Sequence, residues 1–446
     1  MTRRLLAIVF VLAVVAAACG GRGDDDDAAP TDGGATATTE AAPAESDAGV
    51  TDTEILLGAT VTLSGPTGFL GEEVVGAITA YFEKTNAAGG INGRKLRLIT
   101  YDDGGDASQL LANIRKLVEQ DKVLALITGL ADNALDYVDS KKIPTLTFGV
   151  SPTAFASKYP TVFPIVGNAL LWTQEIIAGL QENDVFEAGM KVGMIYDNGF
   201  LDMSPYLDAL EQSWENAGAE VVSIDPFTLE TGSCESLVLK YRDLGVEWWD
   251  FQSAAWFLCV QAAGDQGFKP RVGWGGWPAS VPTIATIAGP AIDGVWGGSN
   301  GDQPDGAPRG PADDFTREFL DALEMYAPDL VSPAHLDSPA TLGYWAGAKL
   351  LVDAISAQGD VITQDGITEW IQSVEDYEIG VTPNIVSMAP DCKTGSESVW
   401  IGQWVWDDVT KTASRTPAGG YFTSPQKEEF GGQCFLTKLS DEILAG

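Results

Sequence analysis

The chain has 446 residues, of which 45% are hydrophobic and 20% are charged, and its 63 acidic and 26 basic side chains give a formal net charge of −37. A chain this acidic is a poor partner for nucleic acid or for an anionic lipid surface, because both are negative themselves. The part able to fold, about 395 residues, exceeds what one hydrophobic core usually holds, so the sequence predicts two lobes.

The N-terminus has the pattern of an export signal. Arg3 and Arg4 precede an unbroken apolar run of 14 residues, 5–18. A bilayer-spanning helix needs about 20 residues, so this run is typical of a signal-peptide core instead. The run ends in small residues before Cys19, which resembles the bacterial lipoprotein signal, where the cysteine becomes the lipidated first residue. The alternative is an ordinary secretory signal with an incidental cysteine.

The next segment is predicted to be a linker. Residues 20–49 are mostly Gly, Asp, Ala, Thr and Pro, with almost no large apolar side chain, so they cannot bury a core. We therefore expect a signal peptide over 1–18 and a lipidated cysteine with a flexible acidic linker over 19–50. The folded domain would be exported, lipid-anchored on the extracytoplasmic face of the bacterial cell membrane, and in contact with the membrane only through Cys19.

A strand–helix–strand unit opens the folded part. Residues 55–63 are an apolar run rich in strand formers, which ends at Ser64-Gly65-Pro66. Residues 71–86 predict a helix with one apolar face, and 96–101 a second strand. The loop between the first strand and the helix is polar and contains glycine. In open α/β sheets such loops lie at the carboxyl ends of strands, where ligands bind.

The same alternation continues along the chain. Further helices are expected at 107–119 (with Asp106 as N-cap), 133–141, 170–183, 203–217, 235–244, 255–266, 312–326 and 339–358. Further strands are expected at 123–128, 144–148, 191–196, 220–224, 248–252 and 271–274. The chain is expected to cross between the lobes near 162–168, 294–298 and 380–383. Alternating strands and helices of this kind predict an α/β fold.

Four cysteines follow Cys19, namely Cys234, Cys259, Cys392 and Cys434. An even number in an exported chain favours two disulfides, although sequence alone allows three pairings. We favour Cys234–Cys259 and Cys392–Cys434 because each closes a local loop, which would stabilise the fold by about 3–4 kcal/mol. A metal site with four cysteine ligands would need CxxC pairs, and the chain has none.

Several segments resemble one known family. These segments are the turns at 64–68 and 86–94 and the later stretches 143–149, 192–198 and 342–348. They are similar to the branched-chain amino-acid (Leu/Ile/Val) type of periplasmic solute-binding protein of ABC transporters. The resemblance runs from about residue 54 to about 406. It implies a type I periplasmic-binding-protein fold, with two Rossmann-like lobes joined by a three-strand hinge. Lobe one would comprise 51–166 and 294–382, and lobe two would comprise 167–293 and the C-terminal segment 383–446.

The resemblance also implies that a ligand binds between the lobes at the strand ends. The implied ligand-binding residues are Ser64, Phe69, Leu70, Ala131, Asp132, Asn133, Gly149, Ser151, Phe200, Gln252, Ser253, Trp256 and Trp277. Ser151 matches a position where the family binds a ligand carboxylate. Asp132 departs from the family, because an ionised carboxylate there would repel one. Asp132 could instead be a helix N-cap, and Ser64 could simply make the turn.

A second departure concerns the ligand ammonium. The family carries a Glu after a Gly-Pro step, whereas this chain has Gly275-Gly276-Trp277-Pro278, which puts α-amino-acid binding in doubt. Trp256, Trp274 and Trp277 would make an aromatic pocket for an aromatic, apolar or cationic solute, with Asp132 as counter-ion. Core packing is the alternative for each tryptophan. The ligand is thus expected to be a small amino-acid-like, aromatic, amide or amine solute.

Catalysis is not expected. His335 is the only histidine, and Asp102, Asp103 and Asp106 are better explained as loop and cap residues than as a metal site. We predict a monomeric binding protein without cofactor or metal that delivers its solute to the transmembrane subunits of an ABC permease. The alternatives are an extracytoplasmic ligand sensor of the same fold, coupled to a signalling partner, and a surface adhesion lipoprotein.

Overall fold

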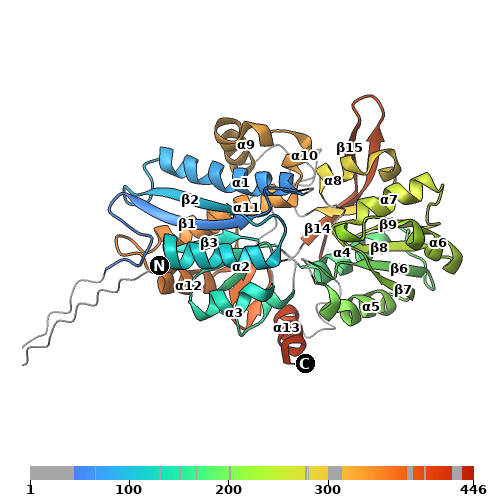
Figure 1. Ribbon diagram of the computed structural model, residues 1–446, viewed down its shortest axis with the longest axis horizontal. Helices are drawn as coiled ribbons and strands as arrows, with labels where there is room; N and C mark the ends of the chain where they lie inside the picture. The colour runs from blue at the N-terminus through green and yellow to red at the C-terminus, as the bar shows by residue number, and fades with distance from the viewer. Residues whose placement is uncertain are drawn as a thin grey trace, which may run out of the picture. The chain divides into compact units, whose positions relative to one another are not determined.

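The first half of the fold is a five-stranded parallel sheet with strand order β2-β1-β3-β4-β5. In the computed structural model its strands are β1 (Glu54–Val61), β2 (Lys95–Asp102), β3 (Ala125–Thr128), β4 (Thr145–Thr147) and β5 (Val162–Pro164) (Figure 1). The short strands β3, β4 and β5 are buried at every position, as expected for a parallel sheet covered on both faces. The structure describes residues 45–65, 67–129, 132–149, 152–166, 168–199, 202–276, 279, 281–299, 314–378, 385–395, 398–423 and 434–445.

Helices cover this sheet. They are α1 (Gly68–Ala87), α2 (Ala107–Lys116), α3 (Asp132–Ser140), α9 (Asp314–Tyr326), α11 (Pro339–Ser356) and α12 (Gln364–Gln372). Asp106 caps α2 as predicted, since its side chain accepts a hydrogen bond from the main-chain N–H of Gln109 at 2.7 Å. The helix expected over 107–119 changes to a π-helical turn, Leu117–Asp121, after α2 ends. α1 packs against α9 and α11, and α11 is buried over most of its length.

The second half is a seven-stranded sheet with strand order β15-β14-β10-β9-β8-β6-β7. Its strands are β6 (Lys191–Tyr196), β7 (Glu220–Pro226), β8 (Trp248–Gln252), β9 (Gly273–Gly275), β10 (Trp296–Ser299), β14 (Ser398–Asp407) and β15 (Thr412–Thr423). Strands β6 to β10 pair in parallel, whereas β14 pairs antiparallel with both β10 and β15 (Figure 1). The segment 294–298, expected as a crossing between the lobes, contributes β10 to this sheet.

Five helices of this half are α4 (Ala169–Glu182), α5 (Leu207–Asn216), α6 (Glu235–Leu244), α7 (Trp256–Asp265) and α8 (Pro282–Ile287). β6, β8 and α6 have the bounds that the sequence predicts. A second cluster of buried side chains packs around Trp249, whose ring centre lies 4.9 Å from that of Tyr241 and 6.4 Å from that of Trp274. We call this group, which includes Phe251 and Trp256, the second cluster. Across the described ranges, every helix falls short of the length and apolar character that crossing a membrane requires.

The elements of the C-terminal segment divide between the two halves. β14 and β15 belong to the seven-stranded sheet, as expected for 383–446. In contrast, β12 (Ile385–Ala389) pairs with β11 (Glu375–Tyr377) and β13 (Cys392–Lys393) and contacts α12 of the first half. α13 (Phe435–Ala445) contacts the 3₁₀ helix Pro152–Phe155, which follows β4. The sequence analysis expected all of 383–446 to lie in lobe two, whereas β12 and α13 contact elements of the first half. The crossing expected near 380–383 lies outside the described residues.

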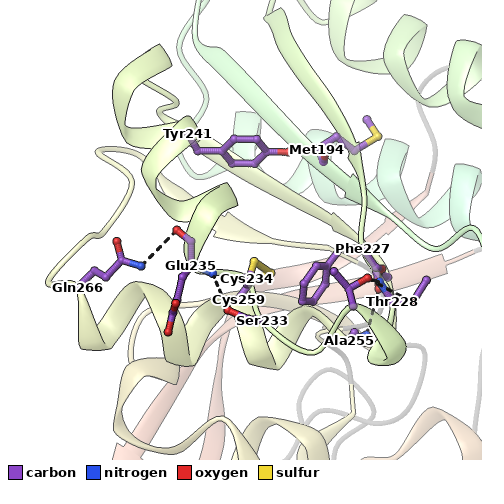
Figure 2. The surroundings of a disulfide bond; sticks show 12 residues. Met194, Phe227, Thr228, Ser233, Cys234, Glu235, Tyr241, Ala255, Cys259 and Gln266 are labelled. Atoms are coloured by element: carbon purple, nitrogen blue, oxygen red, sulfur yellow. Dashed lines mark hydrogen bonds between the residues drawn. A yellow bond between two sulfur atoms is a disulfide. The ribbon is translucent and has the colours of Figure 1, made fainter.

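Both predicted disulfides are confirmed. Cys234, the N-cap of α6, bonds Cys259 of α7, with Cα atoms 4.9 Å apart (Figure 2). Cys392 of β13 bonds Cys434, immediately before α13, with Cα atoms 4.6 Å apart. The second bond explains why α13 does not follow β15 to the seven-stranded sheet: it is covalently tied to β13 instead. Cys19 lies outside the described residues.

Candidate functional site

The loop after β1 is organised by two carboxylates at the end of β2. Asp102 Oδ1 accepts hydrogen bonds from the main-chain N–H groups of Leu63 and Gly104, each at 2.9 Å. The Ser64 hydroxyl donates to the same side chain, and these hydrogen bonds hold the pKa of the Asp102 carboxyl below its usual range. Asp103 Oδ1 accepts from the Thr62 hydroxyl at 2.7 Å. These acids therefore shape the loop, and no group of potential metal ligands occurs among the described residues.

The first turn of α1 lies directly beneath this loop. A Cβ atom at Gly71 would lie 2.1 Å from the carbonyl oxygen of Thr62, so only glycine permits this approach. Phe69 and Leu70 are half-buried and pack against the second cluster. Of the predicted lobe-one residues, these two therefore reach the core of the seven-stranded half. The start of α1 therefore joins the β1 loop to elements of the other half.

The other described lobe-one candidates lie at the carboxyl ends of β3 and β4. Asp132 and Asn133 are exposed in the first turn of α3, and Asn133 Nδ2 donates to the carbonyl of Ala107 at 3.1 Å. Gly149 follows β4 in a left-handed conformation, with a φ of +84°. A side chain there would meet Pro164, because its Cβ would come within 2.6 Å of the Pro164 Cβ. Ala131 and Ser151 lie outside the described residues.

In the seven-stranded half, Gln252 ends β8, Ser253 follows it, and both are fully buried. Gln252 Nε2 donates to Thr173 Oγ1 and to Asp250 Oδ2, each at 2.8 Å, while its Oε1 has no hydrogen-bond partner within the described ranges. The Ser253 hydroxyl donates to the carbonyl of Phe227 at 2.6 Å and accepts from the N–H of Ala255. Ser253 is therefore used in shaping the turn into α7.

The aromatic candidates are placed differently from the expected pocket. Trp256 is 0% exposed and stacks on Phe251, with ring centres 5.5 Å apart in the second cluster. Trp274 is also in this cluster, at 2% exposure. Neither ring offers surface to a solute in this structure, because both are buried in the second cluster. Phe200 and Trp277 lie outside the described residues.

A buried polar cluster that the sequence analysis did not identify centres on Glu73 of α1. Glu73 is fully buried, and the Ser338 hydroxyl donates to its Oε2. Its Oε1 lies 3.3 Å from the hydroxyl of Thr283, in α8, and 3.1 Å from Nδ1 of His335, in α10 (Pro333–Leu336). Burial raises the pKa of Glu73 to about 7, although the hydrogen bonds oppose this rise. The cluster joins α1 and the start of α11 to α8 of the other half.

Ser338, His335 and Glu73 are the residue types of a hydrolytic triad, but their geometry is different. In a triad the histidine lies between the hydroxyl and the acid. Here the Ser338 hydroxyl and the His335 ring both bond to the same carboxyl, and no side-chain hydrogen bond joins those two residues in the described part of the chain. The arrangement satisfies a buried acid and does not activate a nucleophile.

Close to this cluster, Arg415 of β15 forms a second buried contact. Its guanidinium lies over the rings of Trp400 and Trp404, at 4.5 and 4.7 Å from their centres. Nη1 donates to the carbonyl of Gly298 at 2.7 Å, and Nη2 pairs with Asp337 Oδ2 at 2.5 Å. The Arg415 side chain is 0% exposed. Since Asp337 precedes Ser338 in the chain, the two contacts hold the start of α11 to α8 and β15 of the other half.

One sequence signal could have revealed Glu73. It lies four residues before Ala77 and eight before Tyr81, on the buried face of α1. A charged residue in register with an apolar face needs a buried partner. No comparable signal marks Arg415. Its partner Asp337 is distant in the sequence, and the residue pattern of β15 resembles that of an ordinary edge strand.

Comparison with known proteins places the chain in a family. The family model described as periplasmic binding protein matches residues 54–411. The Leu/Ile/Val-binding protein homolog 8 of Brucella abortus (strain 2308) is 25% identical over 341 residues, covering 72% of this chain and 81% of the relative.

Solved structures agree on the fold. A fatty acid ABC transporter substrate-binding protein from Thermomonospora curvata has a TM-score of 0.71 at 21% identity, over 88% of this chain and 97% of that one. A branched chain amino acid ABC transporter protein from Thermus thermophilus with bound valine has a TM-score of 0.69 at 15% identity, over 85% and 99%. The predicted two-lobe α/β fold of the Leu/Ile/Val-binding type is thus confirmed. The chain belongs to the periplasmic binding protein family.

Proposed function

We propose that this protein is the extracytoplasmic solute-binding lipoprotein of an ABC importer, acting as a monomer without catalytic activity. It binds a small solute where the carboxyl ends of β1, β3 and β4 face those of β6 and β8, and delivers it to the permease. Cys19 is its lipid anchor. The family match over residues 54–411 supports the class of function.

One observation carries the location of the site. The loop after β1 presents polar groups at the carboxyl edge of its sheet, while Phe69 and Leu70 directly after it pack on the second cluster. A solute held by this loop touches both halves, so its binding energy can favour one arrangement of the halves over another.

The proposed solute class follows from what the chain offers. The structural neighbours are described with a fatty acid and with valine, which both carry a carboxylate. This chain places Asp132, exposed, at the start of α3 and has Gly275-Gly276-Trp277-Pro278 where the family has an acid for an ammonium group. We therefore propose a small amino-acid-like, aromatic, amide or amine solute, with Ser64, Asp132 and Asn133 as its polar contacts from lobe one.

Thermal unfolding of the protein lacking residues 1–49 tests this function. The solutes are L-leucine, L-phenylalanine, benzoate, decanoate, urea and small amines. A solute at 100 times its dissociation constant should stabilise the fold by about 2.7 kcal/mol, which raises Tm by a few degrees. Stabilisation by one chemical class supports the proposal and names the solute. If none of them changes Tm, the result favours a surface adhesion lipoprotein over a transport protein.

A further inference from the structure

Lys393 of β13 is fully buried, which is rare for a lysine unless its ammonium is paired. Its Nζ donates to the main-chain carbonyls of Tyr159 at 2.6 Å, Ala156 at 3.0 Å and Ala154 at 3.5 Å. Within the described part of the chain its acceptors are all carbonyl oxygens, and no carboxylate contacts the ammonium. The three rotatable donors of an ammonium suit this task, because they can reach three carbonyls that do not share a plane.

The three acceptors belong to one short segment, 152–159, which begins with the 3₁₀ helix Pro152–Phe155. This segment follows β4 and Gly149, at the proposed solute-binding edge. Its other side contacts the seven-stranded half, because the N–H of Thr153 donates to the hydroxyl of Tyr206 at 3.0 Å. Tyr206 ends the 3₁₀ helix Ser204–Tyr206, which follows β6. Segment 152–159 therefore connects two strand ends of the proposed site.

Lys393 is itself held firmly. Its main-chain N–H donates to the hydroxyl of Thr437, in α13, at 2.9 Å. Its neighbour Cys392 is bonded to Cys434, which precedes α13. Asp441 of α13 accepts a hydrogen bond from the N–H of Ser157 at 2.8 Å, so α13 contacts the same segment directly. The C-terminal elements thus form a fixed base from which the ammonium reaches segment 152–159.

We propose that Lys393 is a positioning residue of the solute site. Its ammonium fixes segment 152–159, and through the Thr153–Tyr206 contact it sets how the carboxyl end of β4 meets the chain after β6. This inference rests on the proposed function, since it assigns the role of these strand ends to solute binding. Lys393 touches no solute and acts only through the carbonyls of Ala154, Ala156 and Tyr159.

The protonation of Lys393 gives the inference a specific signature. Burial lowers the pKa of Lys393 to about 7, while the negative charges of Asp139, on α3, and Asp441, on α13, oppose this. A neutral amine has one N–H donor fewer than an ammonium. The segment should therefore be held less firmly as the pH rises through the range in which Lys393 loses its proton.

Hydrogen exchange of the amides of Thr153, Ala156 and Tyr159 tests the inference without any solute. In Lys393→Met these amides should exchange about ten- to a hundredfold faster, because the stem remains while the hydrogen bonds to a charged group are lost. Lys349→Met is the matched control, since Lys349 is a half-buried lysine whose ammonium bonds Asp353 and Tyr377, away from this segment. Unchanged exchange in Lys393→Met, or equal acceleration in both variants, would overturn the proposal.

The wild-type protein provides a second test that needs no variant to fold. Exchange rates corrected for the intrinsic effect of pH should rise for these three amides between pH 6 and 9, but not for amides of β1. A pH response that persists in Lys393→Met does not come from Lys393 and contradicts the assignment.

Measurements of solute binding distinguish a failure of this inference from a failure of the proposed function. With L-leucine, benzoate and decanoate as probes, whichever binds the wild type should bind Lys393→Met about tenfold more weakly and Lys349→Met equally well. Faster exchange with unchanged solute affinity would overturn the positioning role. If no probe binds the wild type, the proposed function fails, while the exchange result still decides whether Lys393 holds the segment.

Discussion

Nδ1 of His335 lies 3.1 Å from Oε1 of Glu73, so the only histidine of the chain contacts a fully buried carboxyl on α1. Burial lowers the pKa of His335 and raises that of Glu73 to about 7. Both shifts favour the uncharged forms, a neutral imidazole and a protonated acid. Because Thr283 of α8 contacts the same carboxyl oxygen, the charge of Glu73 acts where elements of the two halves meet.

The first prediction concerns the pH dependence of stability. The pKa of Glu73 is about 7 in the folded protein, against an ordinary value of 4.5. The folded state therefore binds more protons than the unfolded state between these values, and Glu73 makes the fold less stable as pH rises from about 4.5 to 7. The full effect is about 3 kcal/mol. Glu73→Gln should remove this loss, as urea unfolding at pH 5 and pH 7.5 can measure.

Glu72→Gln is the matched control, because Glu72 is the exposed neighbour on the same helix turn. It changes the net charge equally but should leave the pH dependence as in the wild type. The quantity to compare is the difference in unfolding free energy between the two pH values, variant against wild type. If Glu73→Gln and Glu72→Gln give the same difference, Glu73 titrates normally and the buried assignment fails.

The second prediction concerns the buried pair of Arg415 and Asp337. Arg415→Met leaves the largely buried Asp337 carboxylate without its cation, which should cost about 3–5 kcal/mol. Adding Asp337→Asn should recover part of this loss, because the uncompensated charge disappears. Chemical denaturation of the two variants measures both effects.

The exposed pair of Arg271 and Glu187 serves as the control for charge pairing in general. Its N···O distance is 2.9 Å, and the side chains are 55% and 59% exposed. Arg271 also pairs with Glu247 at 2.6 Å, again from an exposed position. Arg271→Met should therefore cost much less than Arg415→Met. Equal costs for Arg415→Met and Arg271→Met would show that the buried pair contributes no more than a surface contact.

The third prediction distinguishes the structural roles of the two disulfides. Replacing either cysteine pair by serine should lower the unfolding free energy by about 3–4 kcal/mol in the chain-entropy model. Only loss of Cys392–Cys434 should also accelerate exchange at Thr153 and Ala156, because this bond fixes β13 and α13 beside segment 152–159. Loss of Cys234–Cys259, between α6 and α7, is the comparison. Accelerated exchange at these amides in both variants would contradict a local role for the second bond.

Local chemistry explains which features could be predicted. The disulfides follow from loop length and the α2 cap from Asp106, and β6 and β8 are apolar runs bounded by turns. These depend on residues close together in the chain. The placement of α13 depends on distant residues instead, because its contacts with Pro152–Phe155 and with Ser157 join segments far apart in the chain.

The site shows the same division. The polar loop after β1 could be predicted because strand ends and turns are local signals. The sequence could not predict whether Trp256 faces a solute or the core. The helical period identifies a buried face but not the residues that cover it, and here Phe251 stacks on Trp256. The partners of Glu73 and Arg415 come from distant segments, so their pairing requires the tertiary structure.

The last prediction concerns the loop that carries Ser64. Gly71→Ala would place a Cβ 2.1 Å from the carbonyl oxygen of Thr62, so the loop or the first turn of α1 must move. We expect a loss of about 1–3 kcal/mol in unfolding free energy from this overpacking, and weaker binding of any solute that the β1 loop holds. Gly129→Ala, after β3, is the control for stability, because no described atom lies within 4 Å of its added Cβ. Unfolding curves and solute titrations of both variants measure the two effects, and a Gly71→Ala protein as stable as Gly129→Ala would mean that the loop is not packed on α1 as described.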